Sequence, residues 1–385
     1  MKIKLPKRKR FDNDKPDDTV KAQKEKIRLP RAVKIIYAVC VACLPLSVAF
    51  LLSERFSDFF NRYVSSIFRA ITAHLTSWLP FSLAEFMLIL LPIWIILLTR
   101  AIVKRFGDST KELISGILCV CSILGVVFSS FTLGFAPAYR GSTLDKKLGL
   151  ERCDVSAEEL YATALILAEY VDAESESVDF DADGFSVMPY NYTEMNARLL
   201  DAYDTVCDEH KFVQRLDSRL KPVMLSDAMS YTHITGVYTF FTGEANINVA
   251  FPDYTVPFTA AHELSHQRGI ARENEANFMA FLVCKASEDG YIRYSAYLNM
   301  LEYVMSALSS ADYQLYMQVY AKLPMSVKNE LAAYSNFYDK YRESTASDIS
   351  ETVNDTFLKI HGTEGTKSYG MVVDLAVAYF KTGDI

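Results

Sequence analysis

The chain has 385 residues, of which 50% are hydrophobic and 23% charged, and this composition excludes a disordered or fibrous protein. Its net charge of −7 combines two unlike parts: residues 1–34 carry 13 Lys and Arg against 5 Asp and Glu, whereas residues 135–385 carry 20 against 37. Because phosphate contacts require Lys and Arg, the acidic part argues against nucleic acid as a partner. Its three cysteines, Cys153, Cys207 and Cys284, permit at most one disulfide.

Hydropathy predicts three membrane-spanning helices near the N-terminus. Residues 35–53 and 113–134 contain no charge, and residues 81–103 have an apolar core. Each run is close to the ~20 residues that cross the hydrocarbon core of a bilayer. The sequence therefore predicts a basic tail at 1–34, a membrane domain at 35–134 and a further domain at 135–385.

The distribution of Lys and Arg predicts how these spans are oriented. The basic tail precedes the first span, and the loop between the second and third spans holds Lys104, Arg105 and Lys111. Positive charge near span ends stays in the cytoplasm, so the N-terminus is expected inside and residues 135–385 outside the cell membrane. The first span is not expected to be a cleaved signal peptide, because its basic region is too long and two more spans follow.

Residues 55–79, between the first two spans, place aromatic and aliphatic side chains at steps of three and four residues. This spacing predicts an amphipathic helix with an aromatic face. Two placements fit equally well. The helix lies on the outer leaflet of the bilayer, or it packs on the acidic domain.

The acidic domain has the patterns of an α+β fold that is mainly α. Ser156-Ala-Glu-Glu159 is a capping box that begins a helix, and residues 193–212 predict another. Residues 236–243 and 244–251 read as strands of a small sheet. From Val256 onward the pattern is almost wholly helical.

The strongest chemical signal is His262-Glu-Leu-Ser-His266. Residues four apart share one face of a helix, so both imidazoles can bind a single metal ion. Glu263 is rotated by ~100° from His262 and can meet a water molecule instead of the metal. This is the division of labour in HExxH zinc hydrolases. The motif predicts Zn²⁺ bound by His262 and His266, with Glu263 as the general base.

A catalytic zinc usually has a third protein ligand. Arg272 stands where the metzincin pattern places a histidine, which excludes that arrangement. Glu273 and Glu275 remain, and they face different ways on a helix. Glu275 aligns with an apolar stripe that includes Phe278, where a carboxylate needs a partner, and we favour it as the ligand. In the alternative, Glu275 forms an ion pair with Arg268 or Arg272.

These motifs resemble known families. His262-Glu-Leu-Ser-His266, followed by Glu273-Asn-Glu-Ala-Asn277, is similar to the gluzincin class of metallopeptidases. The longer pattern from Gly236-Val-Tyr through this motif to Arg293-Tyr-Ser, with Ser368–Leu375 near the end, resembles a bacterial membrane-anchored zincin-like family catalogued as a domain of unknown function. The likeness covers most of the chain. It implies three transmembrane helices followed by a zincin-like domain with bound zinc, and it leaves the substrate open.

Zincins that resemble this chain hold an extended substrate against an edge strand beside the metal helix. The strand at residues 244–251 is the candidate, with Ala245, Asn246, Ile247 and Asn248 as its substrate-binding residues. Hydrolysis also requires an oxyanion donor. The candidates for this role are Tyr231, His233, Tyr294 and Tyr297.

Two functions follow from these observations. The first is a zinc metallopeptidase, anchored in the membrane, that hydrolyses peptides or proteins outside the cytoplasm. The second is a non-catalytic zincin-fold sensor or binding module for envelope peptides or a partner protein. The presence of Glu263 favours the enzyme, because a binding module has no need of a general base. An intramembrane protease is not expected, because His262 lies far along the sequence from any span. The sequence predicts no oligomeric state.

Overall fold

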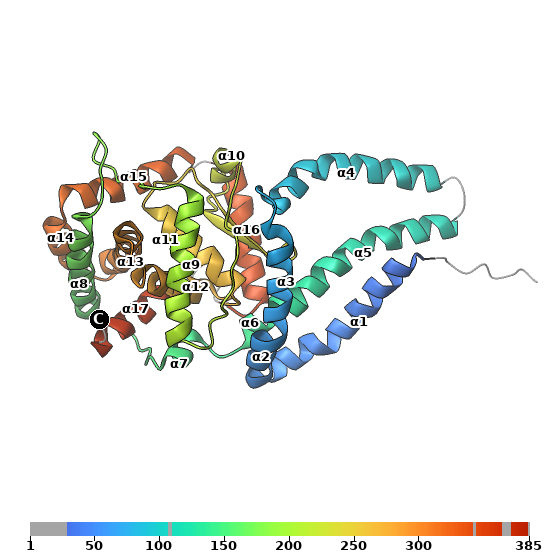
Figure 1. The fold of residues 1–385 in the computed structure, drawn as a ribbon, viewed down its shortest axis with the longest axis horizontal. Helices are drawn as coiled ribbons and strands as arrows, with labels where there is room; N and C mark the ends of the chain where they lie inside the picture. Colours follow the sequence, from blue (N-terminus) through green and yellow to red (C-terminus); the bar gives the residue numbers. More distant parts are fainter. Residues whose placement is uncertain (1–28, 107–109, 342–343, 364–370, 384–385) are drawn as a thin grey trace, which may run out of the picture.

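The computed structural model describes residues 29–106, 110–341, 344–363 and 371–383, and most of the basic tail lies outside this part of the chain. The described residues are mainly helical, with one three-stranded sheet. Three long helices project from one side of a globular body that holds the sheet and most other helices (Figure 1). The expectation of a mainly helical chain with a small sheet is confirmed.

The three projecting helices are α1 (Arg31–Leu52), α4 (Leu83–Phe106) and α5 (Thr110–Gly134). All three are long and apolar enough to cross a membrane. Only 6–17% of their most apolar windows is buried, so they are not core helices of the body. The three predicted spans are thus confirmed as apolar helices of membrane-spanning length.

The predicted amphipathic segment forms α2 (Glu54–Phe60), a π-helical turn η1 (Asn61–Ser65) and α3 (Ser66–Ser77). One side packs on the body: Arg69 is buried, and it donates to the side-chain oxygen of Gln214 at 3.2 Å and to the carbonyl oxygen of Arg268 at 3.4 Å. Large apolar side chains remain exposed on this segment, namely Phe59, Tyr63, Val64, Ile67, Ile71, Leu75 and Trp78. Packing on the body is therefore confirmed, and an apolar face still points outward.

Buried charged side chains join this segment and α4 to the sheet. The ammonium group of Lys221 donates to the carbonyl oxygens of Thr76 and Leu79, where α3 ends. Both carboxylate oxygens of Glu244 accept hydrogen bonds from the first two backbone amides of α4, at 2.9 and 3.0 Å. Helix ends leave such groups without partners inside the helix. The sheet therefore satisfies one end of α3 and one end of α4.

The body contains the remaining helices, and its core lies around α11, α12 and α13 (Figure 1). The predicted capping box is present at the start of α8, where Ser156 and Glu159 each bond the other's backbone. All seven cysteines are free thiols, so the structure has no disulfide among Cys153, Cys207 and Cys284. The helices of the body are α6 (Ala136–Arg140), α7 (Leu144–Leu148), α8 (Ala157–Ser175), α9 (Tyr192–Glu209), α10 (Ser226–Ser230), α11 (Thr255–Gln267), α12 (Glu273–Lys285), α13 (Gly290–Ala311), α14 (Tyr313–Lys322), α15 (Met325–Tyr341), α16 (Thr345–Ile360) and α17 (Val372–Thr382).

The sheet consists of β1 (Lys221–Pro222), β2 (Gly236–Thr239) and β3 (Glu244–Ile247), in the order β1-β3-β2. β3 runs parallel to β1 and antiparallel to β2. The prediction that β3 forms an open edge is wrong, because it is paired on both sides. The four residues proposed to bind substrate, Ala245, Asn246, Ile247 and Asn248, are all buried. The edge strand next to α11 is β2.

Candidate metal centre

The two histidines lie on α11, whose ends follow from its sequence. Pro257 stands in the first turn, where a missing backbone N–H costs no hydrogen bond. Gly269 has a φ of 87°, and the Ile270 amide donates back to the carbonyl oxygen of Ser265 at 3.1 Å. This is the geometry of a Schellman end, which favours glycine. It reverses the chain and brings the start of α12 back toward the histidines.

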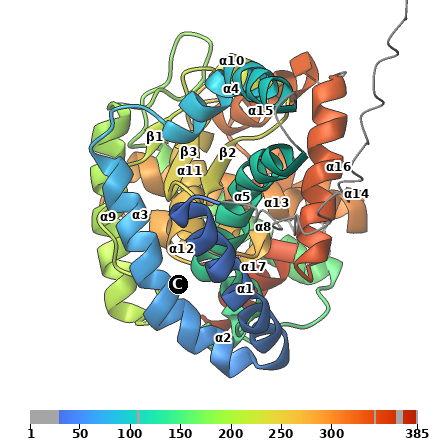
Figure 2. The same ribbon diagram turned by 90° about the vertical axis from the view of Figure 1, so that its right-hand side faces the viewer.

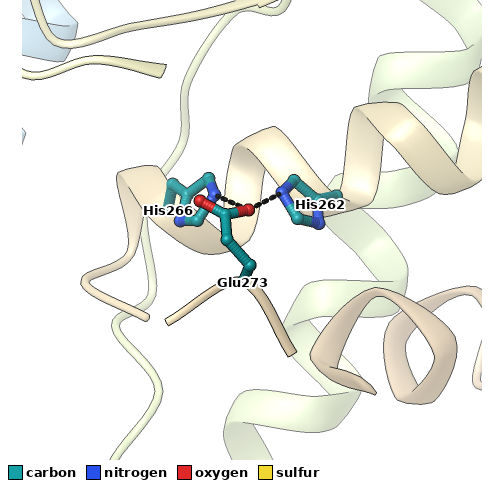
Figure 3. A group of neighbouring side chains, drawn as sticks. All are labelled: His262, His266 and Glu273. Atoms are coloured by element: carbon teal, nitrogen blue, oxygen red, sulfur yellow. Dashed lines mark ion pairs between the residues drawn. The ribbon is translucent and has the colours of Figure 1, made fainter. Parts of the chain in front are cut away.

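Glu273, the first residue of α12, faces both histidines (Figure 3). Its Oε2 lies 3.2 Å from Nε2 of His262 and 3.4 Å from Nε2 of His266. The three ligand atoms lie within 4.8 Å of one another, and all three residues are largely buried. With metal–ligand distances of ~2.0–2.1 Å, ligands of a tetrahedral zinc stand about 3.3 Å apart. The spacing fits a zinc ion at this point.

The other ring nitrogens of the histidines are already engaged. Nδ1 of His262 lies 2.7 Å from the side-chain oxygen of Asn277, and Nδ1 of His266 lies 2.7 Å from the carbonyl oxygen of Ile270. Both oxygens accept, so each Nδ1 carries a proton and Nε2 is the nitrogen that faces Glu273. Such outer contacts orient the histidines that bind metals. Asn277 lies one helical turn after Glu273.

The sequence preference for Glu275 over Glu273 is not supported by the geometry. Glu275 accepts hydrogen bonds from Nη1 of Arg272 at 2.9 Å and from the backbone amide of Leu144 at 3.0 Å. This is the ion pair given above as its alternative. The sequence analysis favoured Glu275 because it aligns with an apolar stripe, but α12 is buried on all sides. An apolar stripe on such a helix cannot show which face meets the metal helix.

Glu263 lies against β2 and is close enough to His262, His266 and Glu273 for their charges to affect its pKa. It is buried, and its Oε2 has no hydrogen-bond partner among the described residues. A Cβ added at Gly236 would lie 2.5 Å from its Oε1, so glycine is required for this close approach. Burial raises the pKa of the Glu263 carboxyl to about 7. A buried acceptor with this pKa suits a general base.

The carboxylate of Glu273 and the ring of His266 shift one another's pKa values. Burial lowers the pKa of His266, but the adjacent Glu273 carboxylate outweighs it and raises the pKa to about 9. Burial raises the pKa of Glu273, but the two histidines outweigh it and hold the pKa well below its usual value. An imidazolium–carboxylate pair therefore occupies the site at neutral pH. A divalent cation that displaced the imidazolium proton would keep the carboxylate paired.

The four candidate oxyanion donors are placed elsewhere. Tyr231 and His233 contact Tyr341 of α15, Tyr297 stacks on Tyr170 with ring centroids 4.7 Å apart, and Tyr294 is buried in the core beside Phe180. Two tyrosines that the sequence analysis did not single out lie closer to the site. Burial and then the charge of Glu273 raise the pKa of Tyr139, and burial, then the charge of Glu302 and to a lesser degree that of Glu273, raise the pKa of Tyr303, so both hydroxyls stay protonated at neutral pH. No pattern in the sequence marks either residue.

The site lies beside the end of α5, the third of the long apolar helices. The ring of His266 packs edge-on against Phe135, the residue that follows α5, with centroids 5.9 Å apart. Phe135 also contacts Tyr238 of the edge strand β2 at 5.3 Å. The motif is distant from the spans along the sequence, but it is next to one of them in space.

Residues 56–377 match the family model described as a protein of unknown function (DUF3810), and the chain belongs to this family. No curated protein and no solved structure matches the chain. The matched range runs from α2 into α17. It therefore takes in α4 and α5, most of the amphipathic segment before them and nearly all of the body.

Proposed function

We propose that this protein is a membrane-anchored zinc metallopeptidase with a zincin-like site. One observation carries the proposal. His262, His266 and Glu273 converge at ligand distances, and the Nδ1 hydrogen bonds turn both Nε2 atoms toward the same point, where His266 binds a metal once it has lost its second proton. Two histidines and a carboxylate are the ligand set of one class of catalytic zinc site. Glu263, next to this set but outside it, supplies the acceptor that hydrolysis needs.

In this mechanism, zinc when bound polarises the scissile carbonyl and acidifies water. Glu263 accepts the proton of the attacking water on its unpartnered oxygen, and then delivers it to the leaving amine nitrogen. Tyr139 and Tyr303, whose hydroxyls stay protonated at neutral pH, are our candidates for the oxyanion donor. Asn277 and the carbonyl of Ile270 hold the two histidine rings in place.

The edge strand β2 is our candidate for holding the substrate. Among the described residues β2 pairs only with β3, and the backbone amide of Tyr238 donates a hydrogen bond to Glu263. An extended peptide that pairs with an open edge is recognised through its main chain, so sequence preference would be weak. Val237 on β2 is 40% exposed and could contact a bound peptide.

The proposal is tested by comparing Glu263→Gln with the parent protein. The full chain is purified in detergent, zinc content is measured, and hydrolysis of a peptide library is followed on the same samples. Loss of the general base should reduce the rate by roughly 10²–10⁴-fold while zinc content is unchanged. Glu330→Gln is a matched control, because Glu330 is also buried with a pKa raised by burial to about 7, and it contacts Ser186.

Full activity in Glu263→Gln would reject the hydrolytic mechanism. Bound zinc without hydrolysis by the parent protein would favour the binding module instead.

We also propose that the body lies outside the cytoplasm, from the Lys and Arg bias of the sequence. Exposed Tyr313 on α14 gives a test: in a Cys153→Ser background, Tyr313→Cys should react with a membrane-impermeant maleimide in intact cells. Asn13→Cys in the same background should react only after lysis. The opposite pattern would place the body in the cytoplasm.

A further inference from the structure

Two helices outside the spans lie across the base of the span bundle. One is α3, and the other is α16. Figures 1 and 2 show both running crosswise to the spans, on opposite sides of α1 and α5. The outward face of α3 is apolar, as described above. The question is whether α16 has such a face as well.

α16 carries an exposed apolar stripe. Ile349, Val353 and Ile360 are 61%, 63% and 68% exposed. At ~100° per residue they fall within about 40° of one another around the helix. The opposite side is buried through Ser347 and Leu358. The helix therefore has two separate faces: one is buried against the body, and the other is an exposed apolar stripe.

The flanks of this stripe differ. On one flank Phe357 contacts Phe131 of span α5, with ring centroids 5.9 Å apart. On the other flank Asp355 and Lys359 form an ion pair at 2.7 Å. The stripe thus adjoins a span on one side and charged, water-facing residues on the other. This order matches a helix that lies in the interface of a bilayer. Because the stripe is continuous with the apolar surface of α5, we identify the lipid bilayer as what covers it.

The candidate metal centre is close to this surface. The last exposed residue of α5 is Val127, and Phe135, which contacts His266, follows eight residues later. At ~1.5 Å per residue this is about 12 Å along the helix axis. An extended peptide covers that distance in about four residues.

We propose that the body rests on the bilayer through α3 and α16, and that its site acts on polypeptide segments within a few residues of a membrane anchor. The substrate class is the juxtamembrane segment of a membrane-anchored polypeptide. This choice of substrate rests on the peptidase function proposed above. The membrane contact of α16 does not depend on that function; it rests on the exposed apolar stripe of α16 and on the contact of Phe357 with α5.

The contact is tested without any activity measurement. The full chain, with Trp78→Phe and Trp94→Phe, receives Val353→Trp and is reconstituted in phosphatidylcholine vesicles with or without brominated acyl chains. Brominated lipid should quench this tryptophan. The control is Tyr313→Trp in the same background, because Tyr313 is 64% exposed on α14, at the end of the body away from the spans (Figure 1). Equal emission from Val353→Trp in both lipids would overturn the contact.

The substrate class is tested with two anchored substrates. A randomised segment is placed either about four residues from a single transmembrane anchor, or behind a rigid helical spacer of about thirty residues, which is ~45 Å long. Each is reconstituted with the full chain, and a soluble protease confirms that both segments are accessible. The near segment should be cut at least about tenfold faster, because the far one is held out of reach of the site.

Equal cleavage of the two anchored segments, or faster cleavage of the far one, overturns the inference and leaves the peptidase function standing. Failure to cut either segment, together with failure to cut the free peptide library, overturns both.

Discussion

The sharpest prediction compares two carboxylates that lie two residues apart on α12. Glu273→Gln removes the charge that faces both histidines, whereas Glu275→Gln removes the charge that faces Arg272. Changing an outer contact of a metal ligand costs about 10–100-fold in affinity, so loss of a direct ligand should exceed ~100-fold, or about 2.7 kcal/mol. In Glu275→Gln the amide oxygen still accepts from Leu144, but the charged hydrogen bond to Arg272 is lost, which costs about 1.5–3 kcal/mol of stability.

Each variant is dialysed against a weak chelator at a temperature well below its unfolding midpoint, and its zinc content per chain is measured. The midpoint of thermal unfolding is then measured on the same samples. Glu273→Gln should lose its zinc. Glu275→Gln should keep about one zinc per chain and unfold at a lower temperature than the parent. Zinc that is lost from Glu275→Gln and retained by Glu273→Gln would refute the ligand assignment made from the geometry.

Three further outcomes are expected. Gly236→Ala places a methyl group 2.5 Å from Oε1 of Glu263, so peptide hydrolysis should fall while zinc content stays the same; an active variant would show that this close approach is not needed. Asn277→Ala removes the acceptor for Nδ1 of His262, so zinc affinity, titrated with a competing chelator, should drop by about 10–100-fold. The pKa of His266 is raised to about 9 in the metal-free site, so it is protonated at pH 7 and must lose that proton to bind metal. Calorimetry in two buffers of different ionisation enthalpy should therefore show release of about one proton per zinc, and affinity should rise with pH up to about pH 9; zinc binding without proton release would contradict the charge state inferred for the site.

Local patterns predicted the parts of the molecule that depend on local chemistry. Long apolar runs marked α1, α4 and α5, because crossing a bilayer requires a minimum apolar length. The four-residue spacing of His262 and His266 was enough to place both rings on one face of α11. The capping box at Ser156 marked the start of α8, because both of its hydrogen bonds lie within one turn of the chain.

The rest depends on pairing between distant segments. β1 is a two-residue strand that contains Pro222, and nothing in its sequence shows that it covers one edge of β3. The choice between Glu273 and Glu275 depends on Arg272 and Leu144 binding the second carboxylate, and the first of these contacts was considered as an alternative. The contact of His266 with Phe135 joins residues that no periodicity connects.

The buried ammonium of Lys221 and carboxylate of Glu244 have a consequence for how this protein can be divided. Their partners lie at the end of α3 and the start of α4. A fragment that begins at residue 135 would keep both charged groups, lose both sets of partners and expose the part of β3 that α3 covers. We therefore expect such a fragment to be less stable than the full chain. During synthesis, α3 and the first turn of α4 emerge before the sheet, so these helix ends gain their partners only after Lys221 and Glu244 have been made.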